Sequence, residues 1–202
     1  MTFILDLIFP TKCIGCEIGP KPICIDCKAV ANPKLIQGFD FPIFAMANYE
    51  GLVEKMLKAY KDSQLVVYKS HLAALLQSQK DCKRLAQGSR IFVPPRNRAN
   101  YRKRGFDPAL ELARKSFGSN RQKVESLKLS RIALDQRRLG RLDRDRNVSG
   151  AFQAPPLHNT EVFLFDDVLT TGATMREMNR SITVAGGKVI GACVLAQRKS
   201  AF

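Results

Sequence analysis

The chain has 202 residues and a mass of 22.6 kDa, which suits one ordinary domain with a small appendage and excludes two full domains. Hydrophobic residues make up 45% of it, which excludes a disordered chain, and the formal net charge of +15 predicts a phosphate-bearing partner, either nucleic acid or a phosphorylated small molecule. No apolar run reaches the length of a membrane span, and residues 1–10 lack the basic start and cleavage site of a secretory signal. We therefore expect a cytoplasmic protein without a membrane span.

Four of the six cysteines lie close together near the amino terminus, as two C-x-x-C pairs: Cys13, Cys16, Cys24 and Cys27. Two such pairs place four thiolates within reach of one tetrahedral ion, which favours a structural zinc site. A disulfide framework and a redox C-x-x-C are the alternatives. Because four thiolates leave no open coordination position, we expect the zinc to hold the fold or a partner surface rather than to take part in catalysis.

The remaining chain predicts an α/β domain. We expect the cysteine knuckle over residues 1–33, a linker or crossover over 32–42, and the main domain over 40–202. Apolar runs predict strands at 43–49, 90–93, 124–129, 161–165 and 189–195. Helical spacing or capping residues predict helices from Leu52, over 71–79, after Asp107-Pro108, and over 174–185. Continuous apolar strands alternating with helices indicate a parallel sheet that is covered by helices on both faces.

The positive charge is concentrated in the middle of the chain. Residues 83–146 hold 19 Lys and Arg against 6 Asp and Glu, which is either a solvated helical surface or a phosphate-facing one. A first cluster is predicted as a cationic loop between a strand and a helix: Arg98, Arg102, Lys103, Arg104 and Gly105. A second cluster is either the solvated face of a helix or a track for a nucleic-acid backbone, with Tyr101 and Phe106 as stacking residues: Arg137, Arg138, Arg141, Arg144 and Arg146.

The most informative segment is residues 162–174, where an apolar strand ends in Asp166 and Asp167 and a threonine–glycine loop then enters a helix. Loops at the carboxyl ends of parallel strands are where α/β folds bind ligands. Backbone N–H groups and a helix N-terminus form an anion cradle, which Gly172 allows a phosphate to approach closely. Carboxylates accept hydrogen bonds from sugar hydroxyls, so the segment predicts a site for a sugar phosphate.

This segment resembles the loop that binds phosphoribosyl pyrophosphate (PRPP) in type I phosphoribosyltransferases. The resemblance implies that Asp166 and Asp167 are the catalytic-site acids that hold the ribose hydroxyls, while the T-T-G-x-T part holds the 5′-phosphate. It implies a PRPP site made of the nine residues Asp166, Asp167, Val168, Leu169, Thr170, Thr171, Gly172, Ala173 and Thr174. It further implies Mg²⁺ bound with PRPP, and a basic loop over the pyrophosphate that includes the first cationic cluster. Lys58 is assigned to the same pyrophosphate, with Lys61 as a second candidate.

Together with the four cysteines, the PRPP-type loop is similar to the ComF (ComFC/GntX-like) family. Further segments agree with that family, among them Arg104-Gly105-Phe106 and Arg146-Asn147. The resemblance implies three functions: a phosphoribosyltransferase with an unknown acceptor, a single-stranded DNA-binding accessory in DNA uptake beside a helicase-like competence protein, or a PRPP-sensing regulator without turnover. A link to nucleotide metabolism and assembly as a homodimer are also implied.

Overall fold

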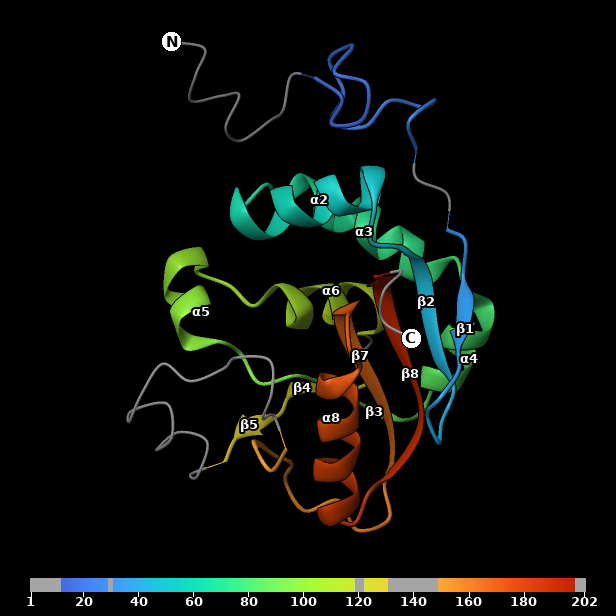
Figure 1. Cartoon of the computed structure of the whole chain (residues 1–202), viewed down its shortest axis with the longest axis vertical. Helices are drawn as coiled ribbons and strands as arrows, with labels where there is room; N and C mark the ends of the chain where they lie inside the picture. Colours follow the sequence, from blue (N-terminus) through green and yellow to red (C-terminus); the bar gives the residue numbers. More distant parts are fainter. Residues whose placement is uncertain (1–11, 29–30, 119–121, 131–148, 199–202) are drawn as a thin grey trace.

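A computed structural model describes residues 12–28, 31–118, 122–130 and 149–198 (Figure 1). Its main element is a six-stranded sheet in the order β1-β2-β8-β7-β3-β4. The strands are β1 (Lys34–Ile36), β2 (Ile43–Asn48), β8 (Lys188–Gln197), β7 (Glu161–Leu169), β3 (Arg90–Val93) and β4 (Val124–Ser126). Every neighbouring pair is parallel except β1 with β2, which is antiparallel at one edge. The chain is therefore an α/β protein with a mostly parallel sheet, as the sequence predicted.

Helices cover both faces of the sheet (Figure 1). One face packs against α2 (Gly51–Asp62), α3 (Val67–Gln77), α4 (Lys80–Ala86) and α6 (Pro108–Phe117). The other packs against α8 (Ala173–Val184) and the small antiparallel pair of β5 (Lys128–Leu129) with β6 (Phe152–Gln153). The start of strand β7 is continuously apolar because both of its faces are buried. Phe163 and Phe165 lie in the first core, and Val162 and Leu164 lie in the second.

Three local predictions were wrong. The linker predicted over 32–42 contains β1, which hydrogen-bonds to β2 and extends the sheet. The predicted cationic loop is a short helix, α5 (Arg98–Arg104), because Asn97 caps its first N–H groups and Gly105 ends it in the left-handed region at φ 77°. The single strand predicted over 124–129 is interrupted at Leu127, so that β4 belongs to the main sheet and β5 to the small one.

Other predictions of local structure are confirmed. The Asp107 side chain accepts the N–H of Leu110 at 3.2 Å, and Pro108 opens α6. Within the described ranges, none of the helices is long and apolar enough to cross a membrane.

The second cationic cluster lies outside the described residues: Arg137, Arg138, Arg141, Arg144 and Arg146.

Glu177 of α8 fixes the second core to the start of β6. Its carboxylate is 3% exposed, accepts the N–H groups of Gly150 at 3.0 Å and Phe152 at 2.8 Å, and pairs with Arg180 at 2.7 Å. Burial raises the pKa of Glu177, but the Arg180 guanidinium and these two amides outweigh it and hold the pKa below its usual range. The ionised carboxylate therefore stabilises the native state above the unfolded pKa, and that contribution is lost as the pH falls.

Replacing Glu177 with Ala is expected to lower the free energy of unfolding by about 3 kcal/mol, because it leaves two amides and a guanidinium without their acceptor. Glu54→Ala is the matched control, since Glu54 makes only a surface ion pair with Lys58 and should cost about 0.5 kcal/mol. Urea denaturation at neutral pH measures both values. Equal losses in the two variants would show that Glu177 is not a buried anchor.

Candidate functional site

The predicted sugar-phosphate segment lies at the carboxyl end of β7, in the middle of the sheet (Figure 1). The strand is longer than predicted and continues through both acids to Leu169, because Asp166, Val168 and Leu169 pair with Val194, Ala196 and Gln197 of β8. A turn then leads through Thr170 and Thr171, which are exposed, into α8. The acids are thus held on a rigid strand and the threonines on the turn that follows it.

Gly172 opens α8 in a conformation that suits an anion. It is the N-cap residue at φ 75°, in the left-handed region that glycine adopts without strain, and no side chain caps the helix from this position. Uncapped N–H groups at a helix N-terminus attract phosphate and carboxylate groups. Arg176 braces the turn, because its Nη1 donates to the Thr171 carbonyl at 2.9 Å while its guanidinium lies 4.8 Å from the centre of the Phe39 ring.

The two acids have different surroundings. Asp167 is paired with Lys61, whose Nζ lies 2.7 Å from Asp167 Oδ2 across the gap between α2 and β7. Asp166 accepts the Asp167 N–H at 2.8 Å. Lys58, by contrast, pairs with Glu54 at 2.8 Å and is 60% exposed. Of the two lysines that the sequence suggested for this site, only Lys61 contacts one of the two site acids among the described residues. The pyrophosphate role of Lys58 stays a prediction.

Burial and the neighbouring Asp167 carboxylate raise the pKa of Asp166 to about 8. Burial also acts to lower the pKa of Lys61, but the Asp167 carboxylate outweighs it and raises that pKa above its usual value. The raised pKa favours the protonated form of Asp166 near neutral pH, while Asp167 is paired with Lys61. One acid can donate a hydrogen bond and the other can only accept them.

This difference predicts a pH dependence of stability. Between about pH 4 and about pH 8 the unfolded Asp166 carboxyl has lost its proton while the native one keeps it, so the native state loses stability as the pH rises. Asp166→Asn removes this titration. Between pH 5 and pH 7, well inside this window, the stability of the variant relative to the parent chain should grow by at most about 1.4 kcal/mol per pH unit. A difference that does not change with pH in urea titrations would contradict the protonated state.

The first cationic cluster is fastened to the helix that carries Lys61. Arg104 pairs with Asp62 at 2.7 Å, and the Lys103 carbonyl accepts a hydrogen bond from Gln64 at 3.2 Å. Arg98, Arg102 and Lys103 are exposed. Helix α5 is thus held at the same end of α2 as the acid site, although its cations make no contact with the acids in the described part of the chain.

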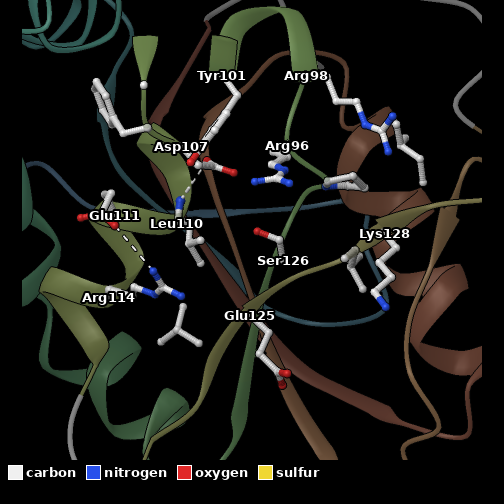
Figure 2. A pocket seen from close by; sticks show the side chains of 16 residues that line it. Arg96, Arg98, Tyr101, Asp107, Leu110, Glu111, Arg114, Glu125, Ser126 and Lys128 are labelled. Atoms are coloured by element: carbon white, nitrogen blue, oxygen red, sulfur yellow. Dashed lines mark hydrogen bonds and ion pairs between the residues drawn. The ribbon is translucent and has the colours of Figure 1, made fainter.

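A cavity of about 850 Å³ lies between α5, the start of α6 and the segment β4–β5 (Figure 2). Its wall includes Arg98 and Gly105 of the predicted cationic loop, together with Tyr101, Phe106 and Asp107. Phe106 packs on Tyr60, the neighbour of Lys61, with ring centres 5.2 Å apart. Burial raises the pKa of Asp107, and the Asp167 carboxylate adds to the rise. Asp107 in the cavity wall therefore interacts electrostatically with Asp167 of the acid site.

The four amino-terminal cysteines converge, with their Sγ atoms all within 4.8 Å of one another. Cys13 is buried, and its Sγ accepts the N–H groups of Gly15 at 3.4 Å and Cys24 at 3.3 Å. The amides of Cys16 and Cys24 lower the pKa of Cys13 to about 6, which favours a thiolate. Four converging sulfurs with amide donors fit a tetrahedral zinc ion, so this cluster could hold zinc as the sequence predicted.

The knuckle is packed on the main domain, because Ile14, Ile23 and Cys27 join the core that α2 and α3 form with the sheet. Gly15 lies directly beside the side chain of Cys27. A Cβ at this position would be 2.8 Å from Cys27 Sγ, which is shorter than side chains tolerate. The cluster therefore needs glycine here.

Gly15→Ala is expected to weaken zinc binding by about tenfold or more, because the added methyl group displaces a ligand sulfur. Ile18→Ala is the matched control on the same knuckle, since Ile18 is 73% exposed and should leave the affinity unchanged. Competition with a chromogenic chelator measures both affinities. If the two variants hold zinc equally well, Cys27 is not a ligand in the arrangement described here.

Sequence reasoning missed two features of this region. Nothing in the sequence paired Lys61 with Asp167, because the two residues are far apart in the chain and meet only through the packing of α2 over the sheet. The cavity was missed for the same reason, since its walls come from α5, α6, β4 and β5. The sequence did contain a signal for α5. Asn is a typical residue at the start of a helix and Gly at its end, and Asn97 and Gly105 are separated by the length of a short helix.

No protein-family model matches the chain, and no curated protein matches it either. Among solved structures, it is similar to hypoxanthine phosphoribosyltransferase from Staphylococcus aureus, with 9% identity and a TM-score of 0.40 over 66% of this chain and 66% of that one. The adenine phosphoribosyltransferase of Rhodothermus marinus gives 14% identity and a TM-score of 0.37 over 82% and 81%. That of Trypanosoma brucei, in complex with AMP, pyrophosphate and ribose-5-phosphate, gives 12% and 0.42 over 84% and 88%.

The chain spans about two thirds of the length of the Staphylococcus aureus enzyme. Its own α/β class is established by the order and direction of its strands, with a parallel core and helices on both faces.

Proposed function

We propose that the chain binds PRPP at residues 166–174 and acts as a phosphoribosyltransferase-type protein of the ComF family. The observation that supports this most strongly is the sequence of features along β7 and α8. Two acids lie near the carboxyl end of the central parallel strand β7, and a threonine turn then leads through the left-handed Gly172 into α8. Thr171 Oγ1 accepts the Ala173 N–H, and Gly172 itself brings no capping side chain. This order offers acceptors for sugar hydroxyls at one end and N–H donors for a phosphate at the other.

Each part of the segment has a role in this proposal. Asp166 and Asp167 hold the ribose hydroxyls. The turn and first helical residues, Thr170, Thr171, Gly172, Ala173 and Thr174, surround the 5′-phosphate with hydroxyl and amide donors. Val168 and Leu169 serve as the fixed base of the turn, since Leu169 is 3% exposed and both pair with β8. Lys61 positions Asp167 through its ion pair.

The pyrophosphate end of PRPP is assigned to cations. Arg98, Arg102, Lys103, Arg104 and Lys58 supply positive charge around the acid site, and Gly105 ends the helix that carries the arginines. Mg²⁺, a hard ion that takes oxygen ligands, would bind with PRPP and neutralise charge on its pyrophosphate. In a transfer reaction, the C1–O bond to pyrophosphate breaks as an acceptor bonds to C1, and the cations of this chain stabilise the charge that the leaving pyrophosphate takes.

The test is calorimetry with PRPP and Mg²⁺, followed by assays for pyrophosphate release with nucleobases and ammonia as acceptors. Saturable binding with release supports the transferase. Saturable binding without release for any acceptor supports the PRPP-sensing regulator, in which the same site acts without turnover. Absence of any binding heat would contradict both.

A second candidate function is the binding of single-stranded DNA, in DNA uptake beside a helicase-like competence protein. It is favoured by α5, where Arg98, Arg102 and Lys103 are exposed beside Tyr101, which is 38% exposed. Aromatic rings among cations are the usual surface for single strands. The affinity for an oligonucleotide should fall steeply with salt, by about one counterion per phosphate contact. A salt-independent affinity would reject this role.

A further inference from the structure

The cavity between α5, α6 and β4–β5 shares Arg98 and Gly105 with the proposed pyrophosphate end of PRPP, but the rest of its wall has no role in that proposal. None of residues 166–174 is among its lining residues. Its volume of about 850 Å³ lies within the range of small-molecule sites. It is therefore a second concave surface on the chain, next to the acid site but separate from it.

One side of the cavity is cationic. Arg96, Arg98 and Lys128 line it from the β3–α5 connection, from α5 and from β5. In Figure 2 Arg98 and Lys128 lie on the side away from the Glu111–Arg114 pair, and Arg96 lies between the two sides. Within the described ranges, none of the three has a carboxylate at ion-pair distance, whereas Glu111 and Glu125 of the same wall are already paired with Lys69 and Arg90. The cavity therefore has positive charge available for an anion.

Another part of the wall offers a surface for an aromatic ring. The Arg96 guanidinium lies over the Tyr101 ring, 4.7 Å from the ring centre, and Leu110, Leu127 and Leu129 line the same cavity. Stacked guanidinium and phenol groups are surfaces on which aromatic bases pack. Inorganic phosphate or pyrophosphate can use the charge of Arg96 but not the tyrosine ring and the leucines.

Two polar atoms of the wall are buried without a hydrogen-bond partner among the residues that the structure describes. They are Asp107 Oδ2 and Ser126 Oγ. Figure 2 shows Asp107 and Ser126 beside Arg96, at the centre of the lining. Unpaired buried polar atoms are rare in native proteins, and a ligand that donates hydrogen bonds to them would satisfy both.

We propose that this cavity binds a nucleoside monophosphate. The base stacks on the Arg96–Tyr101 pair and donates N–H groups to Asp107 and Ser126, and the phosphate is held by Arg98 and Lys128. A nucleotide combines the flat ring, the donors and the anion that the three parts of the wall require. This site shares Arg98 with the proposed pyrophosphate end of PRPP, but it uses none of residues 166–174 and does not require that PRPP binds there.

Calorimetric titration of the full chain with AMP, adenosine and inorganic phosphate tests the proposal. Saturating ribose 5-phosphate is present throughout, because the acid–threonine loop would otherwise compete for the nucleotide under the proposed function. AMP is expected to bind saturably, with adenosine weaker by about tenfold because it lacks the charged group.

Two variants locate the binding. Lys128→Ala should weaken AMP by about tenfold and adenosine by less than about twofold, since only the phosphate contacts this lysine. Tyr101→Ala should weaken both by about tenfold through lost stacking. Lys115→Ala, an exposed lysine of α6 outside the lining, is the control and should change nothing.

Three results would overturn the proposal. They are abolition of AMP binding by ribose 5-phosphate, unchanged AMP affinity in the Lys128 and Tyr101 variants, and inorganic phosphate binding as tightly as AMP. If the parent chain shows no response to PRPP or ribose 5-phosphate while AMP behaves as expected, the proposed PRPP function fails and the nucleotide site stands. The reverse pattern removes the nucleotide site alone.

Discussion

Exchanging Asp167 for Asn is expected to abolish the thermal stabilisation of the chain by PRPP and Mg²⁺. A ligand at about 100 times its Kd stabilises a native protein by about 2.7 kcal/mol, which for a domain of this size raises Tm by about 5–10 °C. Asn at this position loses the charge that strengthens a hydrogen bond from a sugar hydroxyl and that attracts Mg²⁺. The ligand-induced rise in Tm should therefore disappear.

The Tm of the unliganded variant is not the relevant value, because Asp167→Asn also removes the ion pair with Lys61. The quantity to compare is the difference between Tm with and without PRPP. Asp81→Asn makes the same chemical change at a surface ion pair with Arg84, and it should respond to PRPP as the parent chain does. A PRPP-induced rise that survives Asp167→Asn would remove this acid from the site.

Loss of zinc is expected to lower the stability of the chain strongly. Purified protein should contain about one zinc ion per chain, since four converging thiolates form a closed site. The knuckle contributes Ile14 and Ile23 to the core beside α2 and α3, so its collapse uncovers that face. Removing the ion should cost about 3 kcal/mol and lower Tm by about 6–12 °C.

Chelation followed by thermal unfolding measures this effect, and alkylation before and after chelation counts the thiols that zinc protects. Cys16→Ser should reproduce the loss without chelator. Cys82→Ala is the control for zinc content, because Cys82 is a buried residue of α4, outside the cluster, and its variant should keep the ion. Metal-free protein with the four cysteines oxidised to disulfides would contradict the zinc site.

Features that depend on neighbouring residues could be predicted from the sequence, whereas features that depend on contacts between distant residues could not. The sheet was predictable because strands such as β3 and β8 are continuous apolar runs, and the start of α6 was predictable because Asp107 and Pro108 act on the residues next to them. The extension of β7 through both acids was not, because it depends on pairing with Val194 and Ala196 of β8.

The same distinction applies to the candidate site. The order of acids, threonines and glycine is local, so the phosphate turn could be proposed from residues 162–174 alone. The raised pKa of Asp166 could not, because it depends on how far the fold buries this carboxyl as well as on the neighbouring Asp167. The cavity between α5 and β5 likewise exists only once the cationic segment folds as a helix and is tied to α2 through Arg104 and Asp62.

The most direct test of the central claim is a calorimetric titration with ribose 5-phosphate, which has the pentose and the phosphate and no pyrophosphate. The claim is that residues 162–174 hold a phosphorylated pentose. We predict saturable binding with about one ligand per chain, lost in Gly172→Val because a side chain at φ 75° is strained and occupies the phosphate turn. Circular dichroism confirms that the variant is folded. Absence of binding to the parent chain, or equal binding to the folded variant, would contradict the claim.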